Sequence, residues 1–301
     1  AGTGVPRKLF SHNDQQSTWQ ALAPEGAPSG WGGRMGDLLM ALNAAPVFTA
    51  VSAAGNAVFL TGRDVVQYQV ASAGPVGVQI LNHRWTGNSA SVQGVVRANA
   101  RLAGALAGVP APALPPLRLP AASGSVTLDQ LGLAQQLRTV AHAIASAPAL
   151  GLRRQVFLVQ MGGFDTHAQQ MRDHPALSAQ VAASIDWFLA TLNASGLLPN
   201  VTLFTASDFG RTLTANGDGS DHGWGSHHVV AGGGTLGGRI HGRFPTVALG
   251  TDTDVGSGRL LPTTSVTQLA GALGGWMGLS SGELNDVLPG LNGFEALALM
   301  G

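Results

Sequence analysis

The run Gln155-Val-Phe-Leu-Val-Gln-Met161 is nearly continuous in apolar residues and has the length of a buried β-strand. Apolar residues then recur at helical spacing over about 176–195, and a second strand-like run, Val201-Thr-Leu-Phe-Thr-Ala206, follows. A strand, a helix and a strand, with both strands apolar on both faces, are typical of a parallel sheet covered by helices. The sequence therefore predicts an α/β fold with a mainly parallel sheet flanked by helices.

The segments around this unit extend the pattern. Upstream, Ser125, Thr127 and Asp129 can begin a helix, and apolar residues continue at helical spacing to about residue 144. Downstream, a third strand is expected at 228–231, and residues 264–277 and 281–300 have the pattern of terminal helices. We expect all three strands in one sheet.

The first third of the chain has a different pattern. Residues 46–100 contain short β-branched runs separated by Gly and Asn, which indicates hairpins. Residues 102–125 form a connector rich in Pro, Ala and Gly. We therefore expect a β-rich insertion with its connector over 46–125, within a single domain spanning 1–301.

Charge and cysteine content narrow the classes of function. The 16 basic and 16 acidic residues give a formal net charge of zero, so no net field attracts nucleic acid or an anionic membrane. The chain has no cysteine, which excludes disulfides, thiolate catalysis and cysteine-held zinc. No apolar run approaches the roughly 20 residues that span a bilayer, so no membrane span is expected.

Polar clusters follow the predicted strands, at the end where parallel sheets bind ligands. The first strand leads into Gly162-Gly-Phe-Asp-Thr-His167 and the second into Ser207-Asp-Phe-Gly-Arg-Thr212, and a Gly-rich loop then carries Asp218-Gly-Ser-Asp-His-Gly-Trp-Gly-Ser-His-His228. Carboxylates and imidazoles together suit Zn, Mn or Fe. One metal ion, or two sharing a bridging group, would activate a nucleophile and neutralise charge on a transferring phosphoryl or sulfuryl group.

Simpler interpretations exist for several of these residues. Asp165 is placed as a turn or cap residue would be, and Arg211, three residues after Asp208, is a possible ion-pair partner for it. His227 and His228 point to opposite faces if they begin a strand, and we expect His227 to face the site. Ser11 has the pattern of a helix N-cap, and its alternative role is that of a hydroxyl nucleophile at a helix N-terminus.

The motifs together resemble a bacterial family known as domain of unknown function 1501. They run in order over nearly the whole chain: Leu9-Phe-Ser-His-Asn-Asp-Gln-Gln, Gly30-Trp-Gly-Gly-Arg-Met, Gly162-Gly-Phe-Asp-Thr-His, Ser207-Asp-Phe-Gly-Arg-Thr, Asp221-His-Gly-Trp-Gly-Ser-His-His and Gly237-Gly-Arg-Ile-His-Gly. The resemblance implies an alkaline phosphatase-like or sulfatase-like core. It also implies a twin-arginine export signal and hence a periplasmic or secreted protein.

The resemblance also implies a set of site residues. The expected metal ligands are Asp165, His167, Asp208, Asp221, His222 and His227. Ser11 is the candidate nucleophile, and we add Arg211 as a second candidate catalytic residue. The implied activity is metal-dependent hydrolysis of a phosphate or sulfate ester, carried on a small molecule or a polymer.

Three departures from the pattern keep a second function open. Phe209 stands where superfamily enzymes often have a His ligand, and Asp165-x-His167 is tighter than their usual spacing. The chain also begins after the first strand of similar proteins, so a missing N-terminal segment or a second chain is expected to complete the sheet. The alternative is a secreted binding or assembly protein with the same fold and no turnover.

Overall fold

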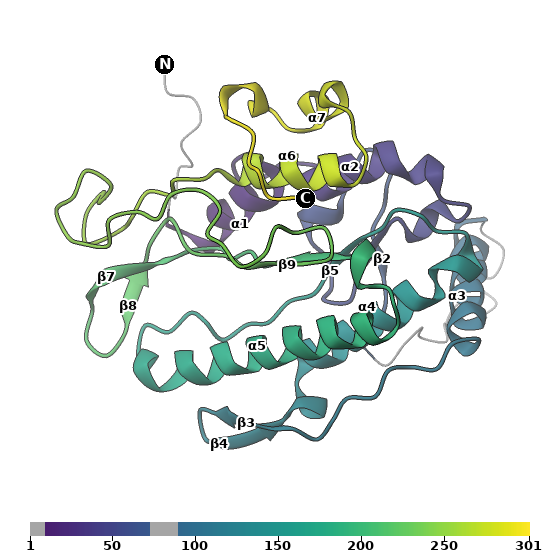
Figure 1. Cartoon of the computed structure of the whole chain (residues 1–301), viewed down its shortest axis with the longest axis horizontal. Coiled ribbons are helices and arrows are strands. Elements are labelled where there is room, and N and C mark those ends of the chain that lie inside the picture. Colours follow the sequence, from purple (N-terminus) through teal and green to yellow (C-terminus); the bar gives the residue numbers. More distant parts are fainter. Residues whose placement is uncertain (1–9, 73–89) are drawn as a thin grey trace.

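The computed structural model describes residues 10–72 and 90–301 and has a mixed α/β architecture. Short strands lie in the middle of the molecule, with helices above and below them (Figure 1). The long helix α5 (Gln170–Ala194) spans much of the lower layer, and α6 (Val266–Trp276) lies in the upper one. The predicted α/β class is confirmed at this level.

The principal sheet has three parallel strands in the order β2-β1-β5. They are β1 (Ala50–Ser52), β2 (Tyr68–Gln69) and β5 (Val156–Leu158). All three residues of β1 are buried, as a central parallel strand requires. β5 lies within the predicted strand 155–161, but β1 was expected in a hairpin and instead pairs with strands distant in the sequence.

The two later strands form a separate ladder. β6 (Thr202–Phe204) pairs antiparallel with β9 (Val230–Gly232), and no ladder joins either to β5 among the described residues. The expectation that all three strands share one sheet is therefore wrong. β5 is an edge strand of its sheet within the described residues, and completion of that sheet by another segment or chain stays a prediction.

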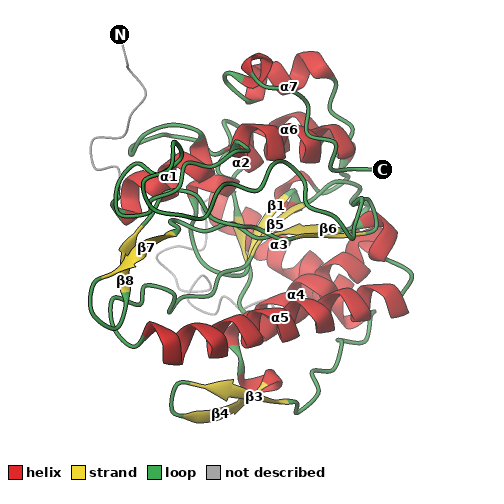
Figure 2. Cartoon of the chain, turned by 60° about the vertical axis from the view of Figure 1, so that its left-hand side comes forward, coloured by secondary structure: helices red, strands yellow, loops and turns green. Residues whose placement is uncertain are grey.

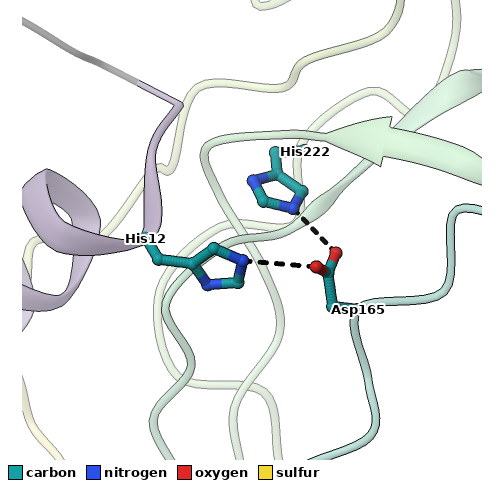
Figure 3. A group of neighbouring side chains, drawn as sticks. All are labelled: His12, Asp165 and His222. Carbon is teal, nitrogen blue, oxygen red and sulfur yellow. Dashed lines mark hydrogen bonds and ion pairs between the residues drawn. The ribbon is translucent and has the colours of Figure 1, made fainter.

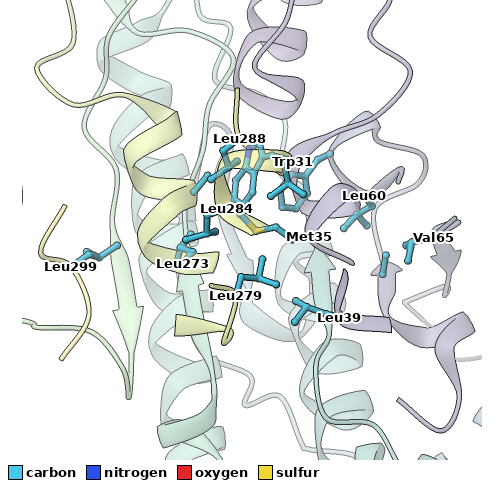
Figure 4. Packing of buried hydrophobic residues seen from close by; sticks show 14 residues of the cluster. Trp31, Met35, Leu39, Leu60, Val65, Leu273, Leu279, Leu284, Leu288 and Leu299 are labelled. Atoms are coloured by element: carbon cyan, nitrogen blue, oxygen red, sulfur yellow. The ribbon is translucent and has the colours of Figure 1, made fainter. Parts of the chain in front are cut away.

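Two apolar cores nevertheless contact both the β2-β1-β5 sheet and the β6–β9 ladder, one core on each side. Val156 and Phe204 pack into an upper core made by α2 (Trp31–Leu39), α6 and α7 (Ser281–Val287). Trp31, Met35, Leu273 and Leu284 interlock there (Figure 4). Phe157 and Leu203 pack on the opposite side. Neighbouring side chains of β5 and β6 therefore point to opposite sides, so that each strand packs against both helical layers.

The lower core is formed by α4 (Gly132–Ser146) and α5. Leu137 and Val140 of α4 pack against Phe188 and Leu192 of α5. A capping box made by Thr127 and Gln130 begins a short 3-10 helix, Leu128–Gln130, so the helical start predicted here is confirmed only for that turn, and α4 itself begins at Gly132 without a side-chain cap. The hairpin of β3 (Arg118–Ala121) and β4 (Gly124–Thr127) lies beneath α5 (Figure 2).

The prediction that residues 46–125 are β-rich holds only in part, because β1, β2 and β3 lie there together with a helix that was not expected. The helix α3 (Ala90–Ala107) occupies positions expected to be strand and connector, and its Leu102 and Leu106 pack beside Phe48. Because many residues of α3 are Ala or Gly, its larger apolar residues do not stand out in the sequence as a helical repeat. The strands expected over 73–89 lie outside the described residues, and the division into one domain with an insertion stays a prediction.

The remaining elements frame the site. α1 (His12–Ala21) lies beside the hairpin of β7 (Arg211–Ala215) and β8 (Ser220–His222) (Figures 1 and 2). Both terminal helices are present, although α7 ends at Val287, well before the predicted limit of residue 300. Among the described residues, no helix combines the length and apolarity needed to cross a membrane.

Candidate metal centre

Three segments that are distant in the sequence bring one side chain each to a common point (Figure 3). His12 is the first residue of α1, Asp165 lies in the loop after β5, and His222 ends β8. One ligand atom from each of them lies within 4.8 Å of the other two. Two imidazoles and a carboxylate in this arrangement are a possible metal site.

Asp165 is the centre of the cluster. Its Oδ1 lies 2.8 Å from His222 Nε2 and 3.0 Å from His167 Nε2, and its Oδ2 lies 3.3 Å from His12 Nε2. Arg211 also donates to Oδ1, over 3.1 Å. The Asp165 side chain remains 42% exposed, so molecules in solution can reach it.

This environment stabilises the charged form of Asp165. Partial burial acts to raise its pKa, but hydrogen bonds from His222 and His12, with the charges of His222 and His167, outweigh that effect. The pKa falls to about 2. Asp165 is therefore a carboxylate at neutral pH, the form that binds a cation.

The start of α1 fixes the place of His12. Ser11 is the N-cap, and its hydroxyl accepts a hydrogen bond from the backbone N–H of Asp14 over 3.4 Å. The cap interpretation of Ser11 is thereby confirmed. The role of Ser11 as a nucleophile stays a prediction.

Asp208 is held by α1 rather than by Arg211. Its Oδ2 accepts from Gln16 Nε2 over 2.7 Å and lies 3.3 Å from His12 Nδ1. His12 and Gln16 are four residues apart on the helix and therefore project from the same face. The alternative pairing of Asp208 with Arg211 is wrong, because Arg211 pairs with Asp165.

Arg211 directs its guanidinium at the protein. Nη1 donates to the carbonyl of Ser220, and Nη2 donates to the carbonyl of Phe164 as well as to Asp165. The guanidinium carbon also lies 4.9 Å from the centre of the Phe209 ring. These contacts hold the Asp165 loop against the hairpin, and a catalytic role for Arg211 stays a prediction.

The β7–β8 hairpin delivers the next two predicted ligands. Asn216 N donates to the carbonyl of Gly219 and closes the turn, in line with the turn chemistry of these residues. Asp221 and His222 follow on β8, and His222 Nδ1 lies 2.9 Å from the carbonyl oxygen of Phe10. Asp221 Oδ1 lies 3.6 Å from His167 Nδ1.

Phe209 supports the imidazoles from one side. Its ring stacks on His222 at 3.8 Å, with 7° between the planes, and meets His12 edge-on at 5.0 Å. Phe209 is 9% exposed, so it is part of the protein interior rather than a contact for solvent. The residue that departs from the superfamily pattern is therefore a packing support for two of the site's histidines.

The structure brings together most of the predicted site residues. Around Asp165 it gathers His167, Asp208, Asp221, His222 and Arg211. Among the described residues, the converging group contains two of the six predicted ligands, Asp165 and His222, and His227 lies apart with its ring stacked on Phe244 at 4.5 Å. His12 is not among the predicted ligands, because the sequence around it has the pattern of a helix cap formed by Ser11 and Asp14.

The family described as "Protein of unknown function (DUF1501)" matches residues 123–288, which is more than half of the chain. The chain belongs to the DUF1501 family. Neither the curated proteins nor the solved structures contain a match to it. The DUF1501 match covers Asp165 and His222 but not His12, which α1 brings to them from outside the matched region.

Proposed function

We propose that this DUF1501 protein is an exported, metal-dependent hydrolase of phosphate or sulfate esters. The observation that carries the proposal is the convergence of His12, Asp165 and His222 from the start of α1, the loop after β5 and the end of β8. The placement in the alkaline phosphatase and sulfatase superfamily, and in the periplasm or outside the cell, belongs to the same proposal. The resemblance of the motifs supports both.

The chemistry follows from the groups present. A divalent ion held there supplies a Lewis acid for the ester oxygen and lowers the pKa of bound water. Asp165 contributes the negative charge that retains the cation, and His12 and His222 contribute neutral nitrogen ligands. His12 is 44% exposed, which leaves room for a substrate to approach. The converging group accounts for one ion, and a second ion stays a prediction.

One observation favours the alternative of a binding or assembly protein. Arg211, the candidate for contacting an anionic ester, donates to two backbone carbonyls and to Asp165. An arginine committed in this way holds the loop and does not clamp a substrate anion. In this alternative the metal site stabilises the fold and no ester is turned over.

An assay of metal-loaded protein separates the two functions. The purified chain is loaded with Zn²⁺, Mn²⁺ or Fe²⁺ and offered p-nitrophenyl phosphate and p-nitrophenyl sulfate, beside a chelator-treated sample. We expect turnover with at least one metal and one ester, and its loss in His12→Ala and in the chelated sample. Bound metal with no turnover of any ester would favour the binding protein.

A further inference from the structure

We infer that the metal centre has three imidazole ligands and one carboxylate, with His167 as the fourth ligand. Asp208 then accepts a hydrogen bond from one ligand and Asp221 lies at ion-pair distance from another, and neither binds the ion. This inference rests on the proposed metal site and gives each surrounding residue a role. It also removes Asp208 and Asp221 from the predicted ligand set.

The first argument is the shared orientation of three rings. His12, His167 and His222 all turn Nε2 toward the carboxylate of Asp165, at 3.3, 3.0 and 2.8 Å. The rings of His167 and His222 lie close together, with centroids 5.1 Å apart. His12 and His222 form the converging group with Asp165, and Nε2 of His167, 3.0 Å from the same carboxylate, is the nearest further nitrogen that could join one coordination sphere.

The second argument comes from the opposite nitrogen of each ring. Nδ1 of His12 lies 3.3 Å from Asp208 Oδ2, and Nδ1 of His222 lies 2.9 Å from the carbonyl of Phe10. Nδ1 of His167 lies 3.6 Å from Asp221 Oδ1, an ion-pair distance that is longer than a hydrogen bond. In each case the neighbour of Nδ1 is an oxygen that only accepts, and metal-bound histidines are held in this way by acceptors on the far nitrogen.

The same oxygens favour a metal ion at this place. An Nδ1 that donates leaves a lone pair on Nε2 in the neutral ring. The lone pairs of His12 and His222 would then face the carboxylate of Asp165, which itself offers only lone pairs. This contact is repulsive unless protons or a metal ion lie between the groups. A divalent ion would accept the lone pairs of the imidazoles and attract the carboxylate at the same time.

The third argument is that the two outer carboxylates are themselves anchored. Gln16 Nε2 donates to Asp208 Oδ2 and Asn216 Nδ2 donates to Asp221 Oδ1, each over 2.7 Å. The two carboxylates thus have matching environments, with a side-chain amide on one side and an imidazole Nδ1 on the other. Groups that orient metal ligands are commonly fixed in this manner.

The ligand set narrows the choice of metal and bears on function. Three imidazoles and one carboxylate suit Zn²⁺ or Fe²⁺ better than Mn²⁺. Four protein ligands close a tetrahedral zinc ion, which is the pattern of structural sites. Catalysis at this centre would therefore require the bound ion to accept water or the ester beside these four residues.

X-ray absorption spectroscopy of the zinc-loaded full chain tests the inference by counting imidazoles. We expect three in the parent and in Asp221→Asn, and two in His167→Gln. His241→Gln is a matched control, because His241 Nε2 contacts the carbonyl of Leu236, and it should retain three. Zinc affinity should fall by more than about 100-fold in His167→Gln, beyond the 10–100-fold typical of outer residues.

The outcomes separate the inference from the proposed function. Two imidazoles in the parent, or no bound zinc, would overturn the inference even if His167→Gln failed to fold. An unchanged count of three in a folded His167→Gln would also overturn it. Three imidazoles in a chain that hydrolyses no ester would support the inference while the proposed hydrolase fails.

Discussion

At the scale of single residues, Asp165 connects the site. Three imidazoles and Arg211 contact its carboxylate, and they come from α1, from the β7–β8 hairpin and from the loop of Asp165 itself. Replacing it should therefore disturb both the binding of metal and the contacts between segments. The lowered pKa of Asp165 determines the direction in which folding stability changes with pH.

The first prediction concerns pH. The pKa of Asp165 lies below the ordinary 3.8, at about 2, so the stability gained from its ionised form is present above pH 4. That stability is lost as the pH falls from about 4 to about 2. In metal-free protein, the free energy of unfolding by urea should therefore fall less steeply over this range in Asp165→Asn than in the parent. Identical slopes would show that the imidazole contacts contribute nothing to folding.

The second prediction distinguishes the outer carboxylates from ligands. Asp208→Asn keeps the shape of the side chain but turns a good acceptor for His12 Nδ1 into a weaker one. We expect metal affinity to fall about 10–100-fold while the metal still binds at saturation. Isothermal titration with Zn²⁺ measures both quantities. A complete loss of binding in a folded Asp208→Asn would make Asp208 a ligand after all.

At the scale of elements, helix starts and tight turns place the ligands. Ser11 caps α1 one residue before His12, and the turn 216–219 places Asp221 and His222 at the end of β8. Neither the Ser11 cap nor the turn 216–219 binds metal, yet both determine where the ligands lie. Their removal should therefore affect the site indirectly.

The third prediction concerns the cap. Ser11→Ala removes the acceptor for Asp14 N–H and should cost about 1 kcal/mol of folding free energy. Ser11→Asp should retain most of that stability, because Asp is an equally good N-cap. Thermal unfolding of both variants measures the difference. Equal losses would argue against the cap, and loss of ester turnover in Ser11→Asp would support the nucleophile prediction.

The fourth prediction concerns Gly219, which is buried against the backbone of His167. A Cβ at this position would overlap the carbonyl group of His167. Gly219→Ala should therefore displace His167, cost about 1–3 kcal/mol and weaken zinc binding. Gly237→Ala is the matched control, since a Cβ there meets open space. Equal zinc affinity in the two variants would separate the turn from the site.

At the scale of the whole molecule, sequence patterns predicted the second half better than the first. The helices α4 and α5 and the strands β5 and β6 were found because long apolar repeats dominate there. β1 is only three residues long, and its parallel partners are remote in the chain, so local signals suggested a hairpin. The pairing of β6 with β9 likewise depends on chain direction, which apolar runs do not encode.

The site residues that follow strands in the sequence could be predicted from it. Asp165, His167, Asp208 and the pair Asp221 and His222 follow strands or lie on a hairpin strand, and they lie close together. His12 was not predictable in the same way, because its position depends on how α1 packs against a loop about 150 residues away in the chain. Its one local signal was a histidine directly after a helix N-cap.

The most direct test of the central claim is the metal content of the purified full chain after loading with Zn²⁺ and removal of free ion. Elemental analysis should give about one equivalent in the parent, as expected for one coordination sphere. Asp165→Asn should retain less than about a tenth of that, because the carboxylate supplies the charge that holds the cation. A parent chain without zinc, or an Asp165→Asn variant with the parent's full content, would contradict the metal centre and the hydrolase built on it.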